Sequence, residues 1–86
     1  MNQTELTQVI QRAAADEREN LDLNNQAITS IPDDIRSLKK LRGLHLLGNQ
    51  LVEVSPAIGE LKGLRVLSLA RNRLERLPPE IAKTLR

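Results

Sequence analysis

The feature that most constrains this chain is a 23-residue internal repeat that runs from residue 18 to residue 86. Three units, 18–40, 41–63 and 64–86, follow one another without insertion or deletion, and we call each unit a coil. Their shared pattern is LxxLxLxxNxLxxLPxxIxxLxx, and its apolar positions are filled throughout except at Arg18 and Thr84. A period of this length predicts stacked copies of one supersecondary unit, because no single unit can bury its apolar face alone.

Each coil contains an L-x-L segment whose two leucines are separated by one residue. This two-residue spacing places both leucines on one face of a short strand and the residues between them on the other face. Stacking the coils then pairs the strands in parallel and buries the leucines in one continuous core. The predicted strands centre on the pairs Leu21 and Leu23, Leu44 and Leu46, and Leu67 and Leu69.

A side-chain amide follows each predicted strand, at the point where the chain turns back toward the interior. The second and third coils place Asn49 and Asn72 there, and the first coil places Gln26. An amide both donates and accepts hydrogen bonds, so we expect these residues to satisfy backbone groups of their own and of neighbouring coils. Gln26 offers the same groups on a longer side chain, and we interpret it as a deviation of the terminal coil, which repeat arrays tolerate.

The return half of each coil is predicted to form one turn of α or 3₁₀ helix. In the first coil Pro32 stands at the expected first helical position and is followed by two acids, Asp33 and Asp34, which favour a helix start. The third coil repeats this arrangement after Pro78. The second coil predicts a weaker turn, because Gly59 lowers the helix propensity.

Residues 1–17 do not follow the repeat and predict an amphipathic helix. Asn2 and Glu5 have the spacing of a capping box at its start. A helix of this kind serves either as a surface that contacts a partner or a membrane, or as a cap over the first coil. We favour the cap, since an uncovered solenoid end exposes its core. Its apolar stripe comprises Leu6, Val9, Ile10, Ala13 and Ala14.

Residues 18–86 resemble the leucine-rich-repeat family, in its 23-residue subclass with the LPxxIxxLxx return. The opening stretch TELTQVIQRAAADERENLDLNNQAITSIP is also similar to the start of bacterial leucine-rich-repeat proteins, including the Roco group. The resemblance implies a right-handed α/β solenoid of three coils with an N-terminal capping helix. It also implies a parallel sheet of three or four strands on the concave side and short helical turns on the convex side. The implied function is binding of a protein or peptide through the concave face, without enzymatic activity.

The implied binding face consists of the residues that flank the strand leucines. Reading across the coils gives three columns: Asn20, Gly43 and Val66; Asp22, His45 and Ser68; and Asn24, Leu47 and Ala70. The outward Leu47 of the third column is the expected apolar anchor. The rims of the face change from acidic in the first coil to basic in the third. The predicted protein-binding residues are Asn20, Asp22, Asn24, Arg42, His45, Leu47, Arg65, Val66, Ser68 and Arg71.

Other chemistries have little support in the sequence. Asp22, His45 and Ser68 contain the ingredients of a nucleophilic triad, but they fall on an open sheet face without evident oxyanion donors. We expect no catalytic residues, metal, cofactor or small-molecule substrate. The chain has no Phe, Tyr or Trp to stack on bases and a net charge of only +2, which disfavours nucleic acid as a ligand. The arginines considered for such binding are Arg42, Arg65, Arg71, Arg73 and Arg76.

Compartment and assembly are predicted from weaker signals. The chain has no Cys, no apolar run long enough to cross a membrane and no signal-peptide pattern, so we expect a cytoplasmic protein without membrane contact. No cap follows the third coil, and Thr84 stands in one of its core positions. An uncapped third coil predicts one of three outcomes: self-association through that end, a fragment of a longer protein, or marginal stability.

Overall fold

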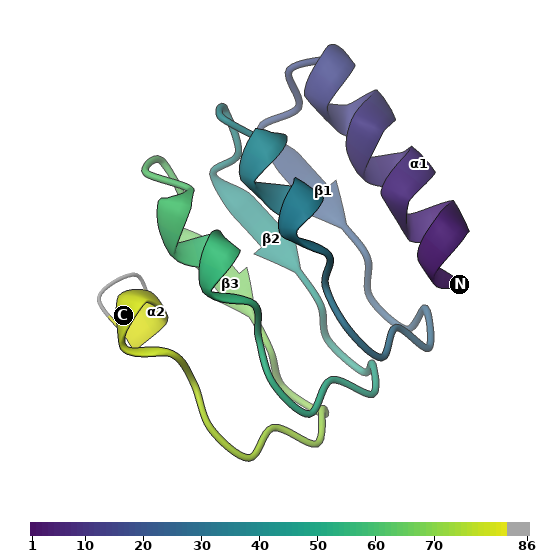
Figure 1. Cartoon of the computed structure of the whole chain (residues 1–86), viewed down its shortest axis with the longest axis vertical. Coiled ribbons are helices and arrows are strands. Elements are labelled where there is room, and N and C mark those ends of the chain that lie inside the picture. Colours follow the sequence, from purple (N-terminus) through teal and green to yellow (C-terminus); the bar gives the residue numbers. More distant parts are fainter. Residues whose placement is uncertain (83–86) are drawn as a thin grey trace.

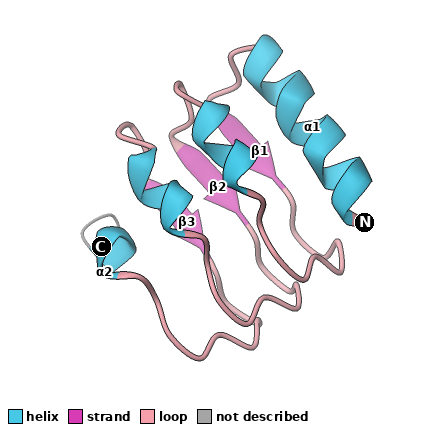
Figure 2. Cartoon of the chain, viewed as in Figure 1, coloured by secondary structure: helices cyan, strands magenta, loops and turns pink. Residues whose placement is uncertain are grey.

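A computed structural model describes residues 1–82 of the chain (Figure 1). Three short strands form one sheet, and the helical segments lie in front of it in the view of Figure 2. The prediction that Thr84 enters the core of the third coil falls outside the described residues. In chain order the elements are α1 (Gln3–Ala15), β1 (Asn20–Asp22), η1 (Asp33–Ser37), β2 (Gly43–His45), η2 (Pro56–Glu60), β3 (Val66–Ser68) and α2 (Pro79–Ala82), where η denotes a 3₁₀ helix.

The amphipathic pattern of the N-terminal segment forms α1, as predicted. Asn2 is its N-cap, and the capping box is complete: the Glu5 N–H donates to Asn2 Oδ1 at 2.8 Å, and the Asn2 N–H donates to Glu5 Oε1 at 3.0 Å. The predicted stripe faces inward, with Leu6 and Ile10 fully buried. The helix packs against η1, and Figure 1 shows it alongside the first coil, on the side away from β2.

The three strands are parallel and lie in the order in which they occur along the chain. Leu21 is in register with Leu44, and Leu44 is in register with Leu67, so each step across the sheet equals the 23-residue period. The strand positions predicted from the repeat are therefore confirmed. Each strand is only three residues long, which means that its stability comes from stacking rather than from its own length.

Burial of the repeated apolar residues falls off at the third coil. Leu44 and Leu46 in the second coil are completely buried, whereas Leu67 and Leu69 in the third remain partly accessible. Leu77 is 40% exposed, although Val54, one period earlier, is buried. Each coil is covered by the coil that follows it, and within the described residues no further coil covers the third.

The repeated asparagines bind the preceding coil. Asn49 is buried, and its Oδ1 accepts hydrogen bonds from the backbone N–H groups of Gln26 and Ile28, both at 3.0 Å. Its Nδ2 donates to the Leu23 carbonyl at 2.9 Å. One period later, Asn72 Oδ1 accepts from the Leu51 N–H at 3.0 Å, and its Nδ2 donates to the Leu46 carbonyl at 2.8 Å. The amides thus satisfy backbone groups that no strand partner reaches.

Gln26 deviates as expected of a terminal coil, and only the expectation that its side chain also bonds a neighbouring coil is corrected. Its side chain is exposed, and its Nε2 donates locally to the Asn24 carbonyl at 3.2 Å. Gln26 therefore does not perform the task of Asn49 on a longer arm. The physical reason is position: the first coil has no preceding coil, so an inward amide there has no backbone groups to satisfy. The loop that follows Gln26 in the first coil instead bonds α1, because Gln3 Nε2 donates to the Ser30 carbonyl at 3.0 Å.

The return segments form single helical turns in all three coils, although one detail differs from the prediction. Pro32 is the N-cap of η1 and not its first helical residue, with an extended ψ of 156°. The predicted weakness of the second turn does not shorten it, because η2 and η1 each span five residues. Ser55 compensates for Gly59 there: its Oγ accepts from the Ala57 N–H at 3.1 Å and donates to Asp33 Oδ1 of the first coil at 2.8 Å.

A left-handed backbone position also recurs with the period. Asn25, Gly48 and Arg71 have φ values of 57°, 72° and 58°. These residues turn the chain out of each strand toward the asparagine position. Glycine and asparagine adopt this conformation easily, whereas Arg71 adopts it with steric strain.

Among the helices of the described part of the chain, none is long and apolar enough to cross a lipid bilayer.

Candidate functional site

The sheet face opposite the helical segments carries two complete columns of side chains. The first column is Asn20, Gly43 and Val66, and the second is Asp22, His45 and Ser68. Both registers agree with the columns predicted from the sequence. Because residues in one column lie on adjacent strands, their side chains are immediate neighbours.

The second column contains a direct side-chain contact. His45 Nδ1 lies 3.3 Å from Ser68 Oγ, and the imidazole is half-buried. Asp22 is engaged elsewhere, since its Oδ1 accepts the Asn24 N–H at 2.9 Å. The carboxylate therefore turns toward its own loop and away from the imidazole. This arrangement gives polar recognition groups without the carboxylate–imidazole link of a nucleophilic triad.

Gly43 makes room for the polar groups of the first column. It is buried, and a β-carbon placed on it would collide with Asn20 Oδ1 and stand 3.3 Å from His45 Nε2. The Asn20 amide therefore lies across the second strand beside the imidazole. Sequence reasoning placed Gly43 in this column but gave it no role. The signal was a glycine at a strand position where a side chain is expected.

The apolar group on this face is Val66, which is 50% exposed. The sequence predicted Leu47 as an outward apolar anchor; it lies just after β2 and is partly exposed, and its role as an anchor stays a prediction. Leu47 lies in the turn after β2 and is half-buried, and its N–H donates to Asn24 Oδ1 at 2.8 Å. Backbone pairing between the coils continues past the end of β2, since the Leu46 N–H donates to the Ser68 carbonyl at 2.9 Å and the Gly48 N–H to the Ala70 carbonyl at 3.0 Å. The third predicted column thus forms the C-terminal margin of the face.

The rims carry the charged residues that the sequence predicted. On one rim Arg42 Nε lies 3.5 Å from Glu19 Oε1, and both side chains are largely exposed. Arg65 is the next residue along this rim and is exposed. Arg71 lies on the other rim at the left-handed turn. An arginine alone does not indicate a left-handed turn. Asn25 and Gly48 at the equivalent positions of the first two coils do indicate one, because both residue types favour this conformation.

One cavity among the described residues lies away from the sheet face. A hollow of about 250 Å³ separates the return segments of the second and third coils, and its walls include Val54, Leu77 and Pro78. It opens where Leu77 is more exposed than its counterparts in the earlier coils. Within residues 1–82, no three His, Cys, Asp or Glu side chains gather closely enough to hold a metal ion.

Comparison with known families decides the class of the protein. The family described as "Leucine rich repeat" matches residues 19–74, which include all three strands and both 3₁₀ helices. The chain belongs to the leucine-rich-repeat family. Repeats of this family generally mediate protein–protein interactions, and nothing in the sheet-face geometry indicates catalysis.

A solved structure supports the same fold. A leucine-rich-repeat protein from Leptospira interrogans superimposes with a TM-score of 0.71 and is 41% identical over 74% of this chain. The matched region is 16% of that protein, so this leucine-rich-repeat chain spans a small part of its structural relative. The comparison with curated proteins gives no match.

Proposed function

We propose that this chain is a protein-binding module that takes a protein or peptide partner on its sheet face. In this proposal residues 18–40, 41–63 and 64–86 are three coils of the 23-residue subclass, and α1 caps the first. The bacterial source of the similar structure supports a bacterial module of this kind, and the lack of Cys fits a cytoplasmic location.

The exposure of Val66 on the sheet face is the main observation that supports the proposal. This residue is a half-exposed valine at the start of an edge strand, on a face whose other side chains are amide, carboxylate, imidazole and hydroxyl groups. Binding sites combine a small apolar contact with polar groups that fix orientation. Around Val66 those groups are Asn20, Asp22, His45 and Ser68. Asn24, Arg42, Leu47, Arg65 and Arg71 form the margin of the proposed site.

A pair of valine substitutions tests this proposal. Val66→Gln places a longer, neutral polar side chain on the sheet face, and Val52→Gln makes the same change at a valine that is 43% exposed in a loop. Affinity capture from the source cell with each variant, followed by quantitative mass spectrometry, measures the retained proteins. We expect Val66→Gln to lose a specific protein that wild type and Val52→Gln retain. Equal retention by all three proteins would refute binding through this face.

A second candidate function is self-association through the third coil. The exposure of Leu77 and the partial exposure of Leu67, Leu69 and Leu74 favour it, because edge strands over apolar layers tend to pair. Under this alternative the chain is a structural or oligomerisation unit. Light scattering coupled to size-exclusion chromatography at tens of micromolar distinguishes the candidates: a dimer that Leu77→Gln dissociates supports the second, and a monomer excludes it.

A further inference from the structure

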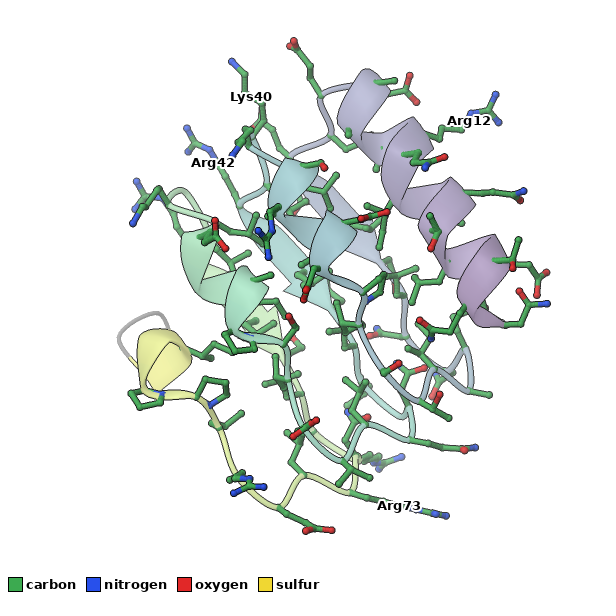
Figure 3. All side chains as sticks on the ribbon, in the orientation of Figure 1. Arg12, Lys40, Arg42 and Arg73 are labelled. Atoms are coloured by element: carbon green, nitrogen blue, oxygen red, sulfur yellow. The ribbon has the colours of Figure 1, made fainter. Side chains whose placement is uncertain are left out.

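The loops that lead into β2 and β3 form a basic edge, which we define as Lys39, Lys40, Arg42, Lys62 and Arg65. All five side chains are exposed. No acidic residue occurs between Asp34 and Glu53, or between Glu60 and Glu75, so each loop and the strand that follows it are free of negative side chains. In Figure 3, Lys40 and Arg42 extend from one side of the molecule and Arg73 from the opposite side.

Like charges are stacked along this edge. The Arg65 N–H donates to the Arg42 carbonyl at 2.7 Å, and the Arg42 N–H donates to the Glu19 carbonyl at 2.7 Å, so the three residues occupy one column on adjacent coils. At the first junction the column is attractive, with Glu19 paired to Arg42. At the second junction arginine follows arginine, and like charges directly opposite one another destabilise a sheet.

The chain does use complementary charges between coils at another junction. Arg36 Nε lies 3.7 Å from Glu60 Oε2, across the junction between the first and second coils. Favourable interaction with the negative ends of helical turns accounts for Lys39 and Lys62, which follow η1 and η2 closely. It does not account for Arg42 and Arg65, which immediately precede the strands. A charge arrangement that lowers fold stability is typical of a functional surface.

We infer that the basic edge binds an acidic segment of a partner protein, whose carboxylates relieve the repulsion between the stacked cations. The inference rests on the proposed function and names the chemistry of the partner, because Arg42 and Arg65 form one rim of the proposed binding face. A peptide fits better than a nucleic acid. The chain offers no aromatic side chain for base stacking, and its net charge is only +2.

Hexaglutamate with blocked termini is a suitable probe, and backbone amide NMR shifts report where it binds. At low salt we expect saturable shifts concentrated in residues 39–43 and 62–66. Raising the salt from about 20 mM to about 200 mM weakens this binding several-fold, because the interaction is between exposed charges. Absence of saturable shifts in wild type, or shifts spread evenly over the chain, would overturn the inference.

Charge reversals with a matched control separate this edge from overall charge. Lys39→Glu with Lys62→Glu is expected to weaken hexaglutamate binding at least tenfold. Arg73→Glu with Arg76→Glu changes the net charge by the same amount but lies outside the edge. Its affinity for hexaglutamate should stay within about twofold of wild type, because the effect of distant charges is largely screened. Equal losses in the two double variants would show attraction by net charge alone and refute a specific edge.

Arg65→Glu gives a second readout, in which thermal stability and hexaglutamate binding change in opposite directions. A charged surface without a binding role would not show this opposition. The substitution turns the column into Glu19, Arg42 and an acid, so the melting temperature should rise while hexaglutamate binding falls at least tenfold. Retained binding, or tighter binding of a thymidine hexanucleotide than of hexaglutamate to wild type, would overturn the assignment of an acidic peptide. Val66→Gln should leave hexaglutamate binding unchanged. The probe therefore tests the edge independently of the partner capture that tests the sheet face.

Discussion

Replacing Asn49 with alanine removes the amide that joins the first two coils. In the native protein Asn49 Oδ1 accepts from the Gln26 and Ile28 N–H groups, and Nδ2 donates to the Leu23 carbonyl. Alanine cannot replace any of these bonds. Ile28 and Leu23 are buried, so their backbone groups lose their partner without gaining water, whereas Gln26 is exposed and its N–H is readily solvated.

The expected loss follows from these two buried groups. A buried donor or acceptor left unsatisfied costs about 1–3 kcal/mol, so the pair costs roughly 2–6 kcal/mol of unfolding free energy. A chain of this length has a total stability of roughly 4–13 kcal/mol, at about 0.05–0.15 kcal/mol per residue. Asn49→Ala is therefore expected to remove a large part of the stability and to leave a marginally folded protein.

The equivalent residues of the other coils form a graded series. Asn72 is only partly buried, so Asn72→Ala should cost about 1–3 kcal/mol. Gln26 bonds its own loop, and Gln26→Ala should change the stability by less than about 0.5 kcal/mol. Urea unfolding followed by far-UV circular dichroism measures all three, since the chain has no aromatic fluorophore. If Gln26→Ala costs as much as Asn49→Ala, the amides serve their own coils and do not join neighbouring ones.

Three further predictions concern the same scaffold, and thermal unfolding checks each. Arg71→Asn should stabilise the protein by about 0.5 kcal/mol, because asparagine tolerates φ of 58° better than arginine. Gly48→Ala should destabilise it by about 1–2 kcal/mol, because Gly48 has a φ of 72°. Equal effects of the two substitutions would contradict the left-handed conformation at these positions. Asn2→Ala removes the capping box and should cost about 1 kcal/mol, and no loss would mean that α1 is not stabilised by its N-cap. Ile10→Ala should cost about 2–5 kcal/mol by opening a cavity under α1, and a smaller loss would indicate that α1 does not cover the first coil.

The sequence predicts the parts of the fold that the period encodes. Leu21, Leu44 and Leu67 align in the sheet because the spacing between them equals the repeat, and alternation along each strand then separates core from surface. The same register places His45 beside Ser68, where the structure has their contact. These features follow from local geometry and from stacking of identical units.

The parts that sequence reasoning missed depend on which coil lies next to which. The expected bonding of Asn49 to a neighbouring coil is confirmed, but the residue type does not show that this neighbour is the preceding coil, or that Gln26 has none. The spacing of the repeat also does not show that Leu47 is only partly exposed, or that its N–H donates to the Asn24 side chain. The role of Gly43 depends on the Asn20 side chain that lies across it, which is a tertiary contact.

The central claim is that the sheet face around Val66 binds a protein partner. Photocrosslinking in the source cell tests it directly, with benzoylphenylalanine placed at position 66 in one variant and at position 52 in another. We expect a discrete crosslinked product from position 66 that excess wild-type chain suppresses, and no such product from position 52. A suppressible product from position 52, with none from position 66, would contradict the claim.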